Sequence, residues 1–205
     1  LEDPCPAVVH DKDSLAVLED TGLPRSRHAL RSAVLVCLRV LARHDRTGFL
    51  NQARVDSVTL ALGALLRAPR TGGKGAESGK SGGAAAVSVP EGTEGFAVFA
   101  EQTLVPTVGD IAASVDDDSL WKRLNYTALL ATRDRRRWVR TAALQWVREV
   151  FVAASSDEVL VLLPETLPFI SERMEDADET VEREAVGLFR ELEKLSGENL
   201  EEYVK

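Results

Sequence analysis

The sequence predicts an all-α fold, an α–α superhelix (solenoid) in which two-helix hairpins stack side by side. Outside residues 71–95, apolar residues recur every three to four positions, as they do along amphipathic helices. No segment alternates in polarity for long, and neither Asn-Gly nor Asp-Gly, the typical β-hairpin turns, occurs. Two helix pairs near the end of the chain also repeat each other at a separation of 42 residues.

The first half of the chain contains three apolar stripes with helical spacing. Their members are Leu30, Val34, Cys37, Leu38 and Leu41; Val55, Val58, Leu62, Leu65 and Leu66; and Phe96, Phe99, Leu104, Val108, Ile111 and Val115. Pro69 should end the second helix and Pro106 should kink the third, because proline has no amide hydrogen to donate. Cys37 lies in the first stripe, which predicts a small core residue.

Residues 71–95 divide the chain. This segment consists of Gly, Ser, Ala and Thr with scattered charges, and it has too few apolar residues to offset the entropy of ordering. We therefore expect N-terminal helical repeats in residues 1–70, a flexible linker in residues 71–95 and C-terminal repeats in residues 96–205. The chain begins at Leu1 rather than at a methionine, which suggests a piece of a longer polypeptide.

Four helices are expected after the linker. Asp116, Asp117, Asp118 and Ser119 are N-cap residue types, so a helix should begin beside them and reach about Thr132. The next carries an apolar face from Val139 to Phe151, and the last two span about Glu158–Glu175, with Pro164 and Pro168 inside, and about Glu179–Leu195. Gly197 is a stop signal, and Leu200, Tyr203 and Val204 could add a final turn.

The helix pairs on either side of residue 155 are copies of each other. Val139 corresponds to Val181 and Ala143 to Ala185, and Asp134 in the preceding turn corresponds to Asp176. A period of about 40–47 residues with two helices per unit is typical of HEAT and armadillo repeats, because each hairpin can bury its apolar stripe only against the next. A helical bundle with evenly spaced helices is the alternative. The predicted repeat core contains Val139, Ala143, Trp146, Val147, Val150, Val181, Ala185, Phe189 and Leu192.

Charge is distributed unevenly along the chain. The formal net charge is −8, and residues 156–205 alone carry fifteen acidic against five basic side chains. This acidic quarter would repel a phosphate backbone, which argues against broad nucleic-acid binding. No apolar run is long enough to cross a bilayer. The two cysteines, Cys5 and Cys37, cannot form a disulfide framework, and a reducing compartment fits best.

No motif in the chain indicates catalysis or a cofactor. The segment from Gly75 to Ser81 resembles a phosphate-binding loop, but its glycine spacing is wrong and neither a strand nor a helix frames it. His10, His28 and His44 have no partners at metal-ligand spacing. We therefore expect no catalytic residue, no cofactor, no metal and no small-molecule substrate.

The densest basic segment is predicted at the turn between two helices. Arg133, Arg135, Arg136 and Arg137 are candidate contacts for an anion or a partner, because a guanidinium binds carboxylate and phosphate through two donors. The alternative is structural: Asp134 would cap the next helix and pair with neighbouring arginines in a ladder between repeats. Both interpretations stay open for the last three arginines.

The second half of the sequence resembles a known family. The segments of residues 120–126, 129–134 and 162–169 are similar to the last repeats of the HEAT-repeat-containing protein 1 family, the large scaffold of the small-subunit processome. The resemblance covers roughly residues 96–205 and includes Gly197, Glu198, Leu200 and Tyr203. Arg123 stands where the family is expected to have proline, and the Gly-rich segment is not a family feature.

The resemblance implies a non-enzymatic scaffold in the nucleolus. Its expected roles are small-subunit assembly, pre-rRNA processing and support of rDNA transcription. Its expected partners are other processome proteins in a ribonucleoprotein, with direct RNA contact a minor feature and no membrane involved. The acidic helices, with Glu172, Glu175 and Glu179, are candidates for basic partners. The alternatives are an armadillo-type transport adaptor for extended peptides, whose repeated Asn and Trp the chain lacks, and direct RNA binding through the arginines.

Overall fold

A computed structural model of the chain describes residues 25–45, 48–67, 96–115 and 117–203. Its elements are α2 (Arg25–His44), α3 (Gln52–Arg67), the π-helical turn η1 (Ala100–Leu104), α5 (Val105–Ala112), α6 (Asp118–Ala131), α7 (Arg137–Ala153), α8 (Ser156–Met174), α9 (Glu179–Ser196) and the 3-10 helix η2 (Leu200–Tyr203). These ranges contain no strand, and the predicted all-α solenoid is confirmed. Within them, no helix is long and apolar enough to cross a membrane.

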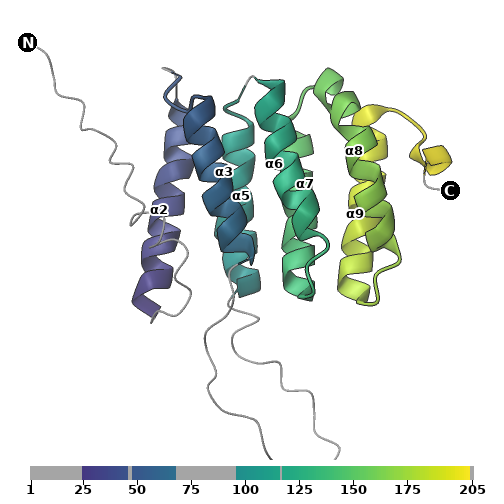
Figure 1. Ribbon diagram of the computed structural model, residues 1–205, viewed down its shortest axis with the longest axis horizontal. Coiled ribbons are helices and arrows are strands. Elements are labelled where there is room, and N and C mark those ends of the chain that lie inside the picture. The colour runs from purple at the N-terminus through teal and green to yellow at the C-terminus, as the bar shows by residue number, and fades with distance from the viewer. Residues whose placement is uncertain (1–24, 46–47, 68–95, 116, 204–205) are drawn as a thin grey trace, which may run out of the picture.

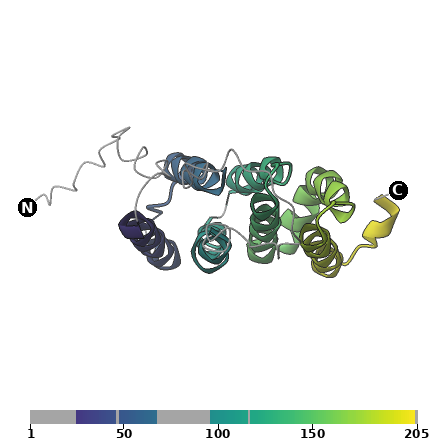
Figure 2. The same cartoon turned by 90° about the horizontal axis from the view of Figure 1, so that it is seen from below.

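The helices form two layers, seen end-on in Figure 2. One layer contains α3, α6 and α8, and the other contains α2, α5, α7 and α9, with each helix packed against the next in its own layer. Figure 1 shows the result as a row of hairpins from α2 at one end to α9 at the other. The helices before and after residues 68–95 therefore belong to one continuous stack, although the expected linker itself lies outside the described residues.

One hydrophobic core runs through the whole stack. Val139 on α7 and Val181 on α9 are both 0% exposed, and these two helices pack against each other. The other residues expected in the repeat core are buried as well: Ala143, Trp146, Val147, Val150, Ala185, Phe189 and Leu192. In a solenoid each helix buries the same stripe against the next helix, so the core extends along the stack instead of lying at one centre.

The ends of the helices follow their capping residues. Asp117 caps α6, and its carboxylate accepts a hydrogen bond from the Ser119 amide at 2.7 Å. Gly197 ends α9 with a positive φ of 71°, a conformation that costs glycine little, and its amide bonds to the Glu193 carbonyl. The expected final turn is η2, which buries Leu200; Val204 lies outside the described residues.

Pro106 acts on the helix that precedes it. It is the second residue of α5, and the turn before it is π-helical, with the Val105 amide bonded to the Ala100 carbonyl. A proline ring collides with the carbonyl four residues earlier and offers no amide hydrogen, and the wider π-turn accommodates both effects. The predicted disturbance at Pro106 thus takes the form of a local change in helical register.

The face of α2 was predicted wrongly. Val34, Cys37 and Leu41, which were expected in the core, are exposed, while Leu35 and Ala42 are buried. The reason is that residues 33–42 are apolar around almost the whole helix, so spacing alone cannot choose the buried side. Packing against α5 determines which side of α2 is buried.

Candidate interaction edge at the helix turns

The arginine-rich segment lies at one edge of the stack, where α6 turns into α7 and α8 turns into α9. We call these two turns, residues 132–136 and 175–178, the turn edge. Their aspartates are equivalent: Asp134 Oδ1 accepts from the Arg136 amide at 2.8 Å, and Asp176 Oδ1 accepts from the Asp178 amide at 3.0 Å. Each carboxylate therefore holds the chain in position for the helix that follows.

Arg140 connects the two turns. Its Nη2 donates to Asp176 Oδ1 at 2.7 Å, and its Nη1 donates to the carbonyls of Asp134 and Arg135. The two side chains are only 13% and 3% exposed, and Arg173 supplies a second partner to Asp176 at 2.9 Å. Burial alone would raise the pKa of Asp176, but the hydrogen bond from Arg140 and the charge of both arginines hold it below its usual value.

Arg133 also reaches the following hairpin. Its guanidinium forms a two-point contact with the Glu172 carboxylate, with Nε at 2.9 Å from Oε2, and lies 4.3 Å from the centre of the Phe169 ring. The hydrogen bond from Arg133 lowers the pKa of Glu172. Both charges are about half exposed, so this pair orients the side chains more than it stabilises the fold.

The remaining candidate arginines differ from one another. Arg136 binds both oxygens of Asp134 at 2.9 Å and donates to the Arg67 carbonyl at 2.7 Å, which ties α3 to the turn edge. Arg137 is half exposed and pairs with Asp178 at 3.3 Å. Arg135 is exposed, and its side chain makes no ion pair with any residue that the structure describes. Of the four, Arg135 is thus the one whose guanidinium is not engaged by a carboxylate of the described residues.

A second set of charged contacts crosses the layer of α2, α5, α7 and α9. Arg39 and Arg43 both donate to Asp110 at 2.7 Å, and their hydrogen bonds lower its pKa although burial opposes them. Further along, Arg148 on α7 binds Glu184 and Glu191 on α9, the latter at 2.7 Å. These contacts could not be predicted from the sequence, because their partners lie between 36 and 71 residues apart.

Glu149 lies between these two groups of charges. Burial raises its pKa; the positive charge of Arg148 acts against this increase, and the negative charge of Asp110 adds to it. Its carboxylate also stands against Gly109, where an added Cβ would come within 2.4 Å of Oε2. A side chain at position 109 would therefore require the Glu149 carboxylate to move.

The other layer has a buried polar contact of its own. Asn125 on α6 donates from Nδ2 to the Thr166 hydroxyl on α8 at 2.8 Å, and both residues are 0% exposed. The Thr166 hydroxyl in turn donates to the Leu162 carbonyl at 2.9 Å. A pattern of apolar stripes cannot reveal such a pair, because each residue by itself looks like an isolated polar position.

The residues that could serve in catalysis or metal binding do not lie together in the part of the chain that the structure describes. In the described ranges, no three His, Cys, Asp or Glu side chains are arranged to hold a metal ion. His44 and Cys37 are exposed on α2. Cys5, His10 and the segment of residues 75–81 lie outside the described residues, as does the side chain of His28.

Comparison with known proteins gives a consistent set of relatives, although no family model matches the chain. It is 31% identical to human "HEAT repeat-containing protein 1" over 192 residues, 94% of this chain and 8% of that protein. The zebrafish protein of the same name is 32% identical over 170 residues, 83% of this chain and 7% of that protein. "U3 small nucleolar RNA-associated protein 10" of Chaetomium globosum is 36% identical over 120 residues, 58% of this chain and 7% of that protein. The chain thus spans less than a tenth of the length of these relatives.

Proposed function

Because the chain belongs to the HEAT repeat-containing protein 1 family, we propose that it is part of a non-enzymatic scaffold of the small-subunit processome. In this role the stacked hairpins hold other proteins in fixed relative positions during ribosome biogenesis. The name of the fungal relative, which associates that protein with the U3 small nucleolar RNA, supports this assignment. The finer roles that we propose are small-subunit assembly, pre-rRNA processing and support of rDNA transcription, in the nucleolus.

The buried contact between Arg140 and Asp176 is the observation that supports a scaffold most directly. A scaffold must keep its repeats in a fixed geometry, and this contact joins consecutive turns with almost no exposure to water. Arg148 with Glu184 and Asn125 with Thr166 add contacts between hairpins in each layer. Directional contacts of this kind fix the angle between hairpins, which apolar packing alone leaves less defined.

Protein partners are favoured over RNA as the main ligands. Arg133, Arg136 and Arg137 already pair with carboxylates of the stack, which leaves little free positive charge at the turn edge. Direct RNA contact is accordingly proposed as minor and confined to the neighbourhood of Arg135. Replacing Arg135 with alanine should lower the salt dependence of any RNA binding by about one phosphate contact.

Affinity purification from nuclear extract tests the proposal. The parent protein, tagged and expressed at its natural level, should recover the U3 small nucleolar RNA and pre-ribosomal proteins at moderate salt. Its depletion should cause precursors of the small-subunit rRNA to accumulate. Recovery of transport factors without pre-ribosomal components would instead favour the armadillo-type adaptor.

A further inference from the structure

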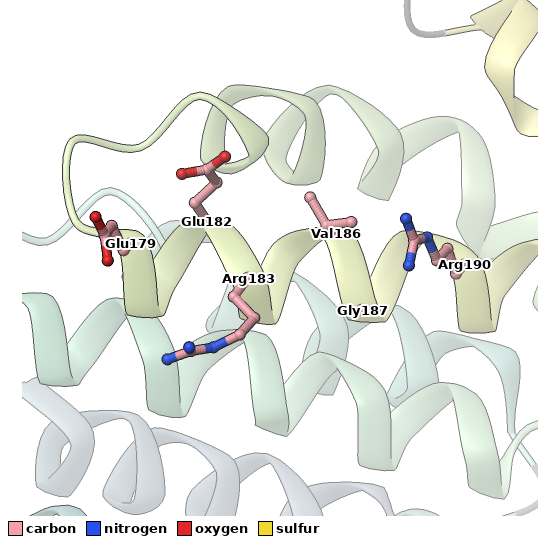
Figure 3. A pocket seen from close by; sticks show the side chains of 6 residues that line it. All are labelled: Glu179, Glu182, Arg183, Val186, Gly187 and Arg190. Atoms are coloured by element: carbon pink, nitrogen blue, oxygen red, sulfur yellow. The ribbon is translucent and has the colours of Figure 1, made fainter.

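The outer face of α9 contains a groove that no part of the described chain covers. Figure 3 shows the groove along the helix, with Glu179 and Glu182 towards one end and Arg190 at the other. The residues that line it are Glu179, Glu182, Arg183, Val186, Gly187 and Arg190. Beyond the groove, η2 follows the end of α9 and buries Leu200. The groove therefore remains open over the first two-thirds of the helix.

The groove is equivalent to a surface that is occupied elsewhere in the same molecule. Subtracting the 42-residue repeat converts its lining residues into Arg137, Arg140, Thr141, Leu144, Gln145 and Arg148 of α7. On α7 these positions include the three arginines that bind α9 and the turn before it. The docking of α9 on α7 thus shows how a helix can bind the equivalent surface of α9.

The charges of the two equivalent surfaces differ at one end. Arg137 and Arg140 of α7 correspond to Glu179 and Glu182 of α9, whereas Arg148 corresponds to Arg190, which keeps its positive charge. On α7 the first end meets Asp176 and Asp178, and the other end meets acidic residues of α9. A helix docked on α9 in the same register must therefore have basic residues at its N-cap and in the turn before it, and acidic residues further along.

Gly187 is the one residue lining the groove that has no side chain. It is exposed in the middle of α9, where glycine costs about 0.5–1 kcal/mol relative to alanine. A Cβ at this position would meet only the Arg148 guanidinium, at an ordinary contact distance of 3.7 Å. Packing within the described chain therefore does not require glycine here, and the equivalent position of α7, Gln145, shows that a helix can dock on this surface without a glycine.

The chain does not provide this helix in the described residues. Counting 42 residues from the start of α8 at Ser156 leads to Glu198, where a further hairpin would begin. At that point the chain instead forms η2, which has four residues. The groove carries two carboxylates, Glu179 and Glu182, and two guanidinium groups, Arg183 and Arg190, and this mixed charge suits a protein helix better than a nucleic-acid backbone, which binds a continuous basic surface.

We propose that the groove on α9 is the docking site for an α-helix of a separate protein. That helix carries lysine or arginine opposite Glu179 and Glu182, a carboxylate opposite Arg190, and a small contact over Gly187. The proposal rests on the scaffold function above and names the chemistry of one partner.

Site-specific photo-cross-linking in the full-length protein tests the proposal. A photoreactive amino acid at position 183, on the rim of the groove, should cross-link to one helical segment of another protein with basic residues at its N-cap and in the turn before it. The substitution pair Glu179→Lys and Glu182→Lys should reduce the cross-link on the order of tenfold. Reversing the partner's basic residues to glutamate should restore it.

Two variants control for loss of folding. Asp157→Lys changes one exposed carboxylate in the first turn of α8, so it carries the helix-dipole cost of one of the two groove substitutions without touching the groove, and the cross-link should persist. Gly187→Leu should abolish the cross-link while the melting temperature stays the same or rises, because leucine forms helices better than glycine.

The other outcomes would overturn the proposal. They are a cross-link to RNA, to a second copy of the chain, to another segment of the same polypeptide or to nothing above background, and a cross-link that survives Gly187→Leu. Recovery of the U3 small nucleolar RNA is measured on the same samples. If that RNA is recovered without the cross-link, the docking proposal fails and the scaffold function stands. If the cross-link forms without the RNA, the docking site stands and the assignment to the processome scaffold fails.

Discussion

Arg140 and Asp176, 36 residues apart in sequence, form a buried ionic contact that joins the α6–α7 turn to the α8–α9 turn. The guanidinium also binds two carbonyls of its own turn, so a single side chain spans both hairpins. The position 42 residues after Arg140 is Glu182, on the open face of α9. The position on α9 that is equivalent to Arg140 therefore carries the opposite charge and lies in the uncovered groove.

Removing the arginine should destabilise the stack substantially. Arg140→Met leaves the Asp176 carboxylate buried with Arg173 as its one remaining arginine partner, and we expect the free energy of unfolding to fall by about 2–4 kcal/mol. Arg137→Met is the matched control: its pair with Asp178 is half exposed, so the loss should stay below about 1 kcal/mol. Urea denaturation followed by circular dichroism measures both. Equal losses for the two variants would show that burial of the Arg140 pair has no special effect.

Thr166→Val should cost about 1–3 kcal/mol of stability, because it leaves the Asn125 amide buried without an acceptor. Thr141→Val, whose hydroxyl is exposed and bonds only to its own helix, should change stability by less than about 0.5 kcal/mol. Thermal unfolding of both variants gives the comparison. Adding Asn125→Leu to Thr166→Val should recover part of the loss, and a further large loss would argue against the contact.

Acid should weaken the turn edge. Asp134, Glu172, Asp176 and Asp178 all have lowered pKa values in the folded chain, so the unfolded chain binds protons more readily as the pH falls. Their contribution to stability is present above about pH 4.5 and decreases as the pH drops through the folded pKa values. Melting temperatures measured from neutral to acidic pH should fall accordingly, with a shallower slope in Asp176→Asn. A melting temperature that rises on acidification would contradict this account.

Gly187→Ala should stabilise the isolated chain by about 0.5–1 kcal/mol, since alanine has the higher helix propensity and its Cβ meets no tight contact. Gly109→Ala provides the contrast. There the added Cβ would fall within 2.4 Å of the Glu149 carboxylate, so this substitution should stabilise less or destabilise. Calorimetry on both variants distinguishes the two glycines. If Gly187→Ala proved destabilising, glycine would be required by the chain itself.

Much of the fold could be predicted from local patterns. The 42-residue repeat identified α7 and α9 as equivalent, and the acidic run around Asp117 and the glycine at 197 marked helix ends that the structure places within a few residues. These features depend on neighbours within one or two helical turns, which the sequence shows directly. The side of α2 that is buried was not predictable, because its apolar residues surround the helix and its packing partner, α5, comes more than sixty residues later.

The contacts of the turn edge could likewise be predicted only in part. The sequence predicts that Asp134 caps the next helix and pairs with neighbouring arginines, because these residues lie close together in one turn. The acceptors of Arg133, Arg137 and Arg148 lie on the next hairpin, and choosing among its many carboxylates requires knowing how the hairpins stack. The same holds for Asn125, whose partner is one polar residue within an otherwise apolar face of α8.

A double-mutant cycle between Arg140 and Asp176 tests the central claim most directly. Urea denaturation of Arg140→Met, Asp176→Asn and the double variant gives the energy by which the two side chains depend on each other. Hairpins stacked through this contact predict a coupling energy of at least about 1 kcal/mol. Additivity of the two single effects to within about 0.3 kcal/mol would show that the turns do not meet in solution, and the proposed scaffold geometry would be wrong.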